Sequence, residues 1–200
     1  MANVYDVCPS FESDKWLLRL TKKEDSEELL SVYSDKNALP FFNSDNCHGD
    51  NFYYSTKERM DSAVDFWIYS YGEGYFVRWT IIDKSIGKAV GTIELFHRES
   101  DGNFGEVGVL RLDLGSAYER EDAISEILSI IIEPAYELFD CDEIISKVPI
   151  YAVERIEAFS KFGFTKSEVC LNGLENKKYY DYWIVKKYME IVYDKRNYRR

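Results

Sequence analysis

The chain has 200 residues with a hydrophobic content of 46% and an aromatic content of 16%, which is enough apolar material for one well-filled domain. Its net charge of −11 argues against nucleic acid and anionic membranes as partners. An acidic surface would attract amines, but the same charge also keeps a protein soluble. The sequence lacks a run of about 18 apolar residues, a secretion signal and a CxxC pair, so it predicts a cytoplasmic protein with reduced thiols.

The first third of the chain alternates between strand and helix signals. The predicted elements are an extended arm over 1–14, a strand over Trp16–Leu20, a helix beginning after Thr21, a loop over Asn37–Asn51 and a helix over Thr56–Tyr71. Thr21 and Glu24 have the spacing of a capping box, which places the start of the first helix there.

The middle of the chain contains the stretch around which we expect the fold to be arranged. Tyr75–Ile82 and Ala89–Phe96 predict an antiparallel hairpin, and Val107–Leu114 is an apolar run that predicts a buried central strand. A helix should follow from about Tyr118–Arg120, with Glu119 among the acids of its first turn. A strand that leads into a helix N-terminus presents free N–H groups, a natural anion site.

The last third predicts two more strands and a further helix. The predicted features are a kink or helix end at Pro134, a strand over Ile144–Val148, a helix over Val153–Phe162 that Gly163 stops, a strand over Tyr179–Lys186 and a basic tail over 189–200. One domain over 15–188 would hold all of these except the tail.

Three segments resemble the GCN5-related N-acetyltransferase (GNAT) family. Gly91–Phe96 (GTIELF), followed by a turn and GEVGVLRL, resembles the family's third and fourth strands, and Arg155–Phe164 (RIEAFSKFGF) resembles its fourth helix with the terminal GF. KYYDYWIVKK resembles the closing strands of the branch that acetylates ribosomal-protein N-termini. The resemblance covers about Trp16 to Tyr188 and implies a mixed α/β fold, with a mostly antiparallel sheet, a splayed pair formed by strands 4 and 5, and flanking helices.

The resemblance implies metal-free transfer of an acetyl group from acetyl-CoA to a primary amine, by direct attack in a ternary complex. In the family, pantetheine lies between the splayed strands and the pyrophosphate binds amides of the next loop. The implied coenzyme-binding residues here are Leu110, Arg111, Leu112, Tyr118, Glu119, Arg120, Glu121, Asp122, Ala123 and Ile124. Arg120, Asp122 and Ile124 stand where glycines are usual, which predicts weakened coenzyme binding.

The resemblance also implies catalytic residues. Glu106 resembles the strand-4 glutamate that serves as general base, although a solvent-facing strand glutamate is an equally good interpretation. Glu94 is a second candidate for the base. Phe159 occupies the place of the tyrosine that protonates the departing thiolate, and Tyr151 and Tyr182 are candidate substitutes.

Two alternatives stay open. The loop without glycines favours a GNAT-fold binding module that lacks turnover, as the alternative to an enzyme acting on a small amine or a protein N-terminus. Cys47 and His48, near Asp45 and Asp50, would suit metal or thiol chemistry, but a chain with two histidines and no nearby second cysteine favours a loop over the acceptor side.

Some of the aromatic side chains could line a cleft for a cationic or aromatic acceptor. The oligomeric state is left open, with a homodimer as one possibility.

Overall fold

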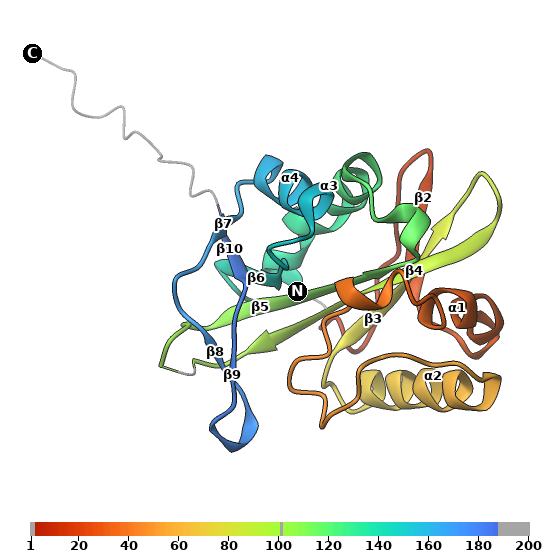
Figure 1. The fold of residues 1–200 in the computed structure, drawn as a ribbon, viewed down its shortest axis with the longest axis horizontal. Coiled ribbons are helices and arrows are strands. Elements are labelled where there is room, and N and C mark those ends of the chain that lie inside the picture. The colour runs from red at the N-terminus through yellow and green to blue at the C-terminus, as the bar shows by residue number, and fades with distance from the viewer. Residues whose placement is uncertain (1–2, 101, 188–200) are drawn as a thin grey trace, which may run out of the picture.

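A computed structural model describes residues 3–100 and 102–187 of the chain. Within these residues one large sheet has the strand order β1-β2-β3-β4-β5-β6-β10-β7, and β8 pairs with β9 in a small second sheet (Figure 1). The strands are β1 (Phe11–Glu12), β2 (Trp16–Leu20), β3 (Val77–Asp83), β4 (Lys88–Arg98), β5 (Val107–Leu114), β6 (Glu143–Lys147), β7 (Thr165–Lys166), β8 (Leu171–Asn172), β9 (Lys178–Tyr179) and β10 (Tyr182–Lys186). The helices are α1 (Ser26–Tyr33), α2 (Lys57–Gly72), α3 (Glu121–Leu138) and α4 (Val153–Lys161).

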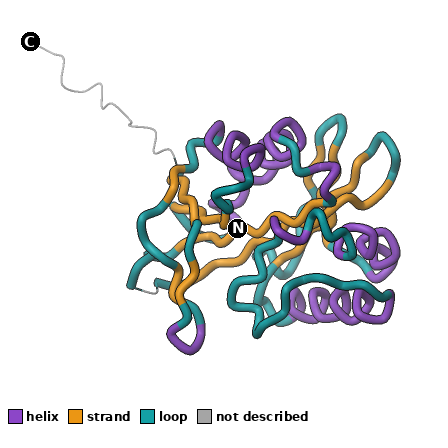
Figure 2. The backbone as a smooth tube through the Cα atoms, viewed as in Figure 1, coloured by secondary structure: helices purple, strands orange, loops and turns teal. Residues whose placement is uncertain are grey.

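Helices cover both faces of the large sheet. Figure 2 shows α3 and α4 on one side of the strands and α1 and α2 on the other. The alternation along β5 explains the two layers, because Leu110 and Leu112 belong to the apolar core beneath α3, whereas Arg111 and Asp113 point to the face of α1 and α2. The first face therefore holds an apolar core and the second holds a polar cluster.

The predicted splay between two neighbouring strands is present. β5 and β6 form the parallel pair of the sheet, joined by the crossover helix α3, and their pairing ends at Leu110 and Ser146. β5 continues to Leu114, so its last four residues have an edge that β6 does not pair. This predicted mixed α+β architecture, with a mostly antiparallel sheet, is confirmed.

The start of the first helix differs from the prediction. A 3-10 turn over Lys23–Asp25 precedes α1, which begins at Ser26. The hydroxyl of Thr21 donates to the carbonyl of Arg78 at 2.9 Å and accepts from the hydroxyl of Thr80 at 3.0 Å, so both bonds join it to β3 and not to the helix. Asp25 provides the carboxylate instead and accepts from the amide of Lys22 at 2.9 Å. The predicted box of Thr21 with Glu24 is wrong.

Two features of α3 also differ. The helix begins at Glu121 after a 3-10 turn over Ser116–Tyr118, so Glu119 lies before its first turn. Of the two outcomes predicted for Pro134, a helix end is wrong, because the helix continues to Leu138, and a kink stays a prediction. Pro134 leaves the carbonyl of Ile130 without its usual helical donor, and burial of the apolar face on both sides of the proline offsets that loss.

The elements near the two ends of the chain differ in detail from those predicted. The predicted last strand is divided into β9 and β10, because Asp181 has a φ of 63° and interrupts the extended backbone. The predicted N-terminal arm contains β1, which pairs with β2. The predicted basic tail lies outside the described residues, and the domain limits stay a prediction. No helix among the described residues is both long and apolar enough to span a bilayer.

Candidate functional site

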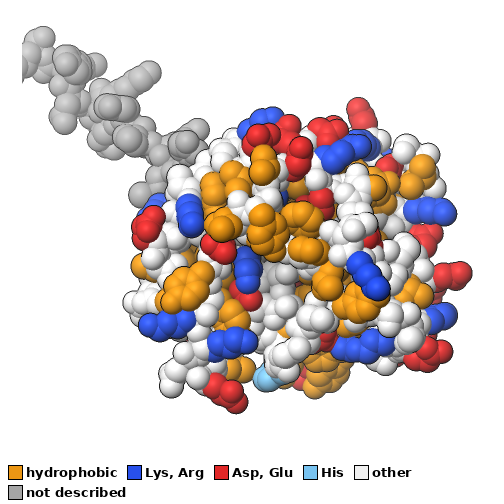
Figure 3. Space-filling model, viewed as in Figure 1, with side chains coloured by type: hydrophobic (Ala, Val, Ile, Leu, Met, Phe, Trp, Pro, Cys, Tyr) orange, Lys and Arg blue, Asp and Glu red, His pale blue; other side chains and the backbone are white. Residues whose placement is uncertain are grey.

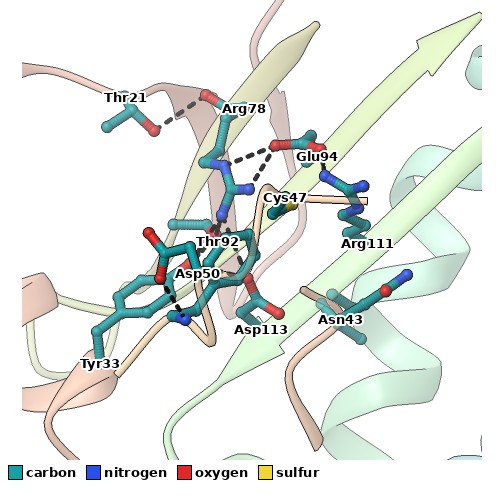
Figure 4. Close-up of polar contacts among 12 residues, drawn as sticks. Thr21, Tyr33, Asn43, Cys47, Asp50, Arg78, Thr92, Glu94, Arg111 and Asp113 are labelled. Atoms are coloured by element: carbon teal, nitrogen blue, oxygen red, sulfur yellow. Dashed lines mark hydrogen bonds and ion pairs between the residues drawn. The ribbon is translucent and has the colours of Figure 1, made fainter. Parts of the chain in front are cut away.

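A row of charged side chains crosses three strands on the face that α1 and α2 cover (Figure 4). The strand register places Arg78 of β3 opposite Glu94 of β4, and Glu94 opposite Arg111 of β5. Glu94 is only 1% exposed. Its carboxylate accepts from Nε of Arg78 at 3.0 Å and from Nη1 of Arg111 at 2.8 Å, so both of its oxygens are used.

Arg78 is the centre of this cluster. Its Nη1 donates to the hydroxyl of Tyr33 at 2.9 Å and to the hydroxyl of Thr92 at 3.0 Å, and it lies 3.2 Å from a carboxylate oxygen of Asp113. Its guanidinium carbon lies 4.2 Å from the ring centroid of Trp67 on α2. A buried arginine is thus held by carboxylates, hydroxyls and an aromatic ring, as its desolvation requires.

The two buried acids of the cluster differ in their proton affinity. Burial alone would raise the pKa of Glu94, but Arg78 and Arg111 outweigh it and lower that pKa. Burial raises the pKa of Asp113, and the opposing effects of Arg78, of the hydrogen bond from Tyr33 and of Arg155 compensate only in part. Glu94 is therefore a firmly ionised counter-ion and a weak base.

A pocket of about 340 Å³ opens above this row of charges. The loop around Cys47 and His48 and the helix α2 form its other walls. Its aromatic lining consists of Phe52, Tyr54, Phe66, Trp67 and Phe76, and its charged lining consists of Asp50, Arg59, Arg78, Glu94 and Arg111. We call it the aromatic pocket. Figure 3 shows acids and bases interspersed over the visible face of the molecule, so the net charge of −11 does not form one patch there.

The loop between α1 and α2 is fixed to the sheet by Asp45. Its carboxylate accepts from Nζ of Lys147 on β6 at 2.7 Å and from the hydroxyl of Tyr182 on β10 at 3.3 Å. Its carbonyl accepts from Nη2 of Arg111 at 2.8 Å. The described residues hold no group of three or more His, Cys, Asp or Glu side chains that could bind a metal ion. The loop that carries Cys47 forms one wall of the pocket.

On the opposite face, Arg155 of α4 occupies the space where β5 and β6 diverge. It is 1% exposed, and its Nη1 donates to the carbonyl of Leu112 at 2.9 Å and to the carbonyl of Phe41 at 3.2 Å. Its Nε donates to Glu119 at 3.2 Å, and the two side chains form a buried ion pair. Burial raises the pKa of Glu119, and the pairing with Arg155 counteracts only part of that rise.

The N-terminus of α3 already has carboxylate partners. The amide of Glu121 donates to the carboxylate of Glu154 on α4 at 2.8 Å. The amide of Ala123 donates to the carboxylate of Asp122, which is the main reason for the lowered pKa of Asp122. Two of the amides at this helix start, where an anion site was predicted, therefore already donate to acids of the chain itself.

Two of the predicted catalytic residues are linked and the third lies apart, because Arg111 bonds both to Glu94 and to the carbonyl of Asp45, the partner of Tyr182. Glu94 belongs to the polar cluster, and Tyr182 is buried beside Asp45, where burial and the neighbouring carboxylate raise its pKa. Glu106 is exposed and precedes β5, at the end opposite to the splay. From Glu106 to Leu112 the strand spans about 20 Å, at roughly 3.3 Å for each residue.

The predicted coenzyme-binding residues are also divided between environments. Leu110, Leu112, Ala123 and Ile124 are buried in the core, Arg111 belongs to the polar cluster, and Tyr118 donates to Asp83. Arg120 and Asp122 pair with each other on the surface. Glu119 and Glu121 make the contacts to α4 described above. Their predicted role in coenzyme binding stays a prediction.

Four residues of the aromatic pocket and of the region where β5 and β6 diverge had not been predicted from the sequence. They are Arg59, Arg78, Glu154 and Arg155. The sequence around Arg78 did contain a usable signal. Arg78 is a charged residue within the otherwise mostly apolar strand VRWTIID, and a charged side chain that is buried there needs a partner of opposite charge. The pair of Arg155 and Glu119 is separated by 36 positions and had no such signal.

Comparison with known proteins gives a match by structure alone. No protein-family model and no curated protein sequence matches the chain. Solved structures match at low identity. A ribosomal L7/L12 α-N-protein acetyltransferase in complex with coenzyme A has a TM-score of 0.68 at 15% identity, with 90% of this chain and 98% of that chain covered. A ribosomal-protein-S5-alanine acetyltransferase from Vibrio fischeri has a TM-score of 0.62 at 16% identity, with 92% and 98% covered. A GCN5-related N-acetyltransferase from Brucella melitensis has a TM-score of 0.65 at 16% identity, with 89% and 78% covered.

Proposed function

Because this chain has the GNAT fold, we propose that it is a small-ligand-binding protein built on that fold. The aromatic pocket holds the ligand, and the cleft that would take acetyl-CoA is closed by the chain's own side chains. The observation that carries this proposal is Arg155, which bonds to the unpaired edge of β5 and is itself buried.

The space between β5 and β6 does not fit a pantetheine chain. A chain lying along the edge of β5 that β6 leaves free would meet the buried side chain of Arg155, whose guanidinium is bonded to the carbonyl of Leu112 on that edge. To admit the coenzyme, Arg155 would have to leave, and Glu119 would then be a buried carboxylate without its cation. Breaking a buried ion pair in this way costs about 3–5 kcal/mol.

The start of α3 adds a smaller obstacle. A pyrophosphate would compete there with the carboxylates of Glu154 and Asp122 for the amides of Glu121 and Ala123. Both carboxylates are at the surface, where each opposes a phosphate charge by about 1 kcal/mol at 4 Å, less in salt. The buried pair of Arg155 and Glu119 is therefore the larger barrier.

The candidate catalytic groups also favour binding over turnover. Glu94 is committed to two arginines that lower its pKa, which makes it a weak base. Tyr182 has a raised pKa, which makes it a weak acid for a departing thiolate. Glu106 lies at the end of β5 away from the splay. The pKa shifts thus disfavour Glu94 as a base and Tyr182 as an acid, and the position of Glu106 places it away from the edge of β5 that β6 leaves unpaired.

Acetyl transfer to a primary amine is the second candidate. The observation that favours it is the splay of β5 from β6, together with the match to a structure that contains coenzyme A. In that case Arg155 and Glu119 would move apart when acetyl-CoA binds, and Leu112 would become available to the coenzyme.

A thermal-shift measurement with acetyl-CoA separates the two candidates. A ligand present at ten times its Kd stabilises by about 1.4 kcal/mol, which is about 3–6 °C for a domain of this size. We expect no shift at about 1 mM acetyl-CoA and no release of free thiol with an amine panel. A saturable shift accompanied by thiol release would overturn the binding proposal in favour of acetyl transfer.

A further inference from the structure

The aromatic pocket has an excess of cationic side chains in an acidic protein. Its lining includes three arginines, whereas its acids are Asp50 and Glu94. A further acid, Asp113, lies behind Arg78 and does not line the pocket. The local balance is thus opposite in sign to the net charge of −11.

Both acids of the pocket already have cationic partners. Glu94 accepts from two arginines, and Asp50 forms an ion pair with Arg59. Asp50 also accepts from the amide of Phe52 at 2.8 Å and from the hydroxyl of Tyr54 at 3.2 Å. An ammonium group entering the pocket would find no uncommitted lining carboxylate and would face three guanidinium groups.

Arg59 has donors to spare for an anion. Its guanidinium stacks over the ring of Tyr54 with a centroid distance of 4.5 Å, and its side chain is about half exposed. One nitrogen of its five-donor fork bonds to Asp50, and no other acceptor for it exists among the described residues. A stacked arginine with a free edge is suited to bidentate binding of a carboxylate.

The remaining surface suits an apolar, planar group. Phe66 is 57% exposed, and its ring lies 6.2 Å from the ring of Phe76, another residue of the lining. Exposed aromatic rings at a pocket offer stacking surface at little entropic loss. The cavity volume of about 340 Å³ matches a small molecule.

We propose that the aromatic pocket binds a small carboxylate with an aromatic or other planar body, whose carboxylate is held by Arg59. This inference rests on the proposed ligand-binding function and names the ligand class. It differs from the amine acceptor that the resemblance to acetyltransferases implies, because the pocket offers donors and no free carboxylate.

Calorimetric titration with two matched probes tests the ligand class. 3-Phenylpropionate and 2-phenylethylamine share a phenyl ring and a two-carbon linker and differ in the sign of the charge. We expect 3-phenylpropionate to bind with a Kd of about 1 mM or below and 2-phenylethylamine to bind at least about tenfold more weakly. Equal or tighter binding of the amine, or no binding of the carboxylate at about 10 mM, would overturn the ligand class.

Substitutions on α2 locate the site. Arg59→Gln should weaken 3-phenylpropionate about tenfold or more, because the bidentate partner is lost. Lys57→Gln removes a cation from the same helix outside the pocket, and its titration should match the wild type. An unchanged Kd in Arg59→Gln would contradict the proposal. A parallel titration with acetyl-CoA separates the two proposals. Saturable heat with acetyl-CoA would count against the closed cleft, whereas no binding of 3-phenylpropionate would count against the ligand class alone.

Discussion

Replacing Arg155 with methionine should destabilise the fold strongly while keeping the apolar length of the side chain. Arg155 is 1% exposed and is bonded to Glu119 and to the carbonyls of Leu112 and Phe41. Removing one partner of a buried ion pair typically costs about 3–5 kcal/mol. For a domain of about 200 residues this corresponds to a fall in Tm of about 6–20 °C.

The pH dependence of this loss is a stricter test. Without Arg155, the pKa of buried Glu119 should rise further above its ordinary value. A carboxyl group whose pKa is higher in the folded than in the unfolded protein stabilises the fold as the pH falls. The deficit of Arg155→Met should therefore be smaller near about pH 5 than near about pH 8.

Urea unfolding of four proteins checks both points. The set comprises the wild type, Arg155→Met, the double variant that also carries Glu119→Met, and Arg120→Met as a matched surface control. The double variant should recover most of the loss, and the control should change stability by less than about 0.5 kcal/mol. A loss below about 1 kcal/mol in Arg155→Met, or no recovery in the double variant, would show that the pair is not the energetic barrier to opening that the closed cleft requires.

Two further predictions concern the sheet and the acid limb of stability. Gly91→Ala would place a Cβ 2.3 Å from the carbonyl oxygen of Asp113, so we expect a loss of about 1–3 kcal/mol or more in urea unfolding, whereas Gly105→Ala, with nothing within 4 Å, should be close to neutral. Burial would raise the pKa of Asp25, but the hydrogen bond from Arg19 and others lower it below 3.8; this carboxylate therefore stabilises the fold fully above that pH and loses its effect as the pH falls further. In Asp25→Asn the free energy of unfolding, followed by circular dichroism, should therefore fall less steeply as the pH is lowered through the acid range. An unchanged pH dependence in that range would contradict this assignment.

Most of the sheet could be predicted because its strands are apolar runs bounded by turn residues. Val107–Leu114 was predicted with its observed limits, since both of its faces are buried and little else competes with that pattern. The last strand was predicted as one element because β-prone residues stand on both sides of Asp181, from Tyr179 to Val185. The left-handed Asp181 that divides it is a single backbone position with no hydrophobic signal.

The closed cleft could not be predicted because it depends on two side chains that meet only in the folded chain. Glu119 was predicted to lie in the first helical turn, where acids are common. Its carboxylate turns to Arg155, and the helix begins two residues later. Sequence periodicity describes which face of α4 is apolar, but it does not tell which carboxylate a buried arginine of that face will find.

The pocket shows the same limit for charge. The composition gave a net charge of −11 and pointed to cationic ligands. The register of β3, β4 and β5 instead places Arg78 and Arg111 on both sides of one glutamate, and α2 adds Arg59 at the pocket. A net charge describes the whole surface, whereas the preference of a pocket depends on which few side chains line it and which of those are already paired.

Calorimetric titration of acetyl-CoA into the wild type and into a variant carrying Arg155→Ser and Glu119→Gln tests the closed cleft most directly. We expect no saturable heat for the wild type at about 1 mM acetyl-CoA, and binding in the range of about 10–500 µM for the variant, in which the carbonyl of Leu112 is free. Wild-type binding with a Kd of about 100 µM or tighter, or a wild type that binds as well as the variant, would contradict it.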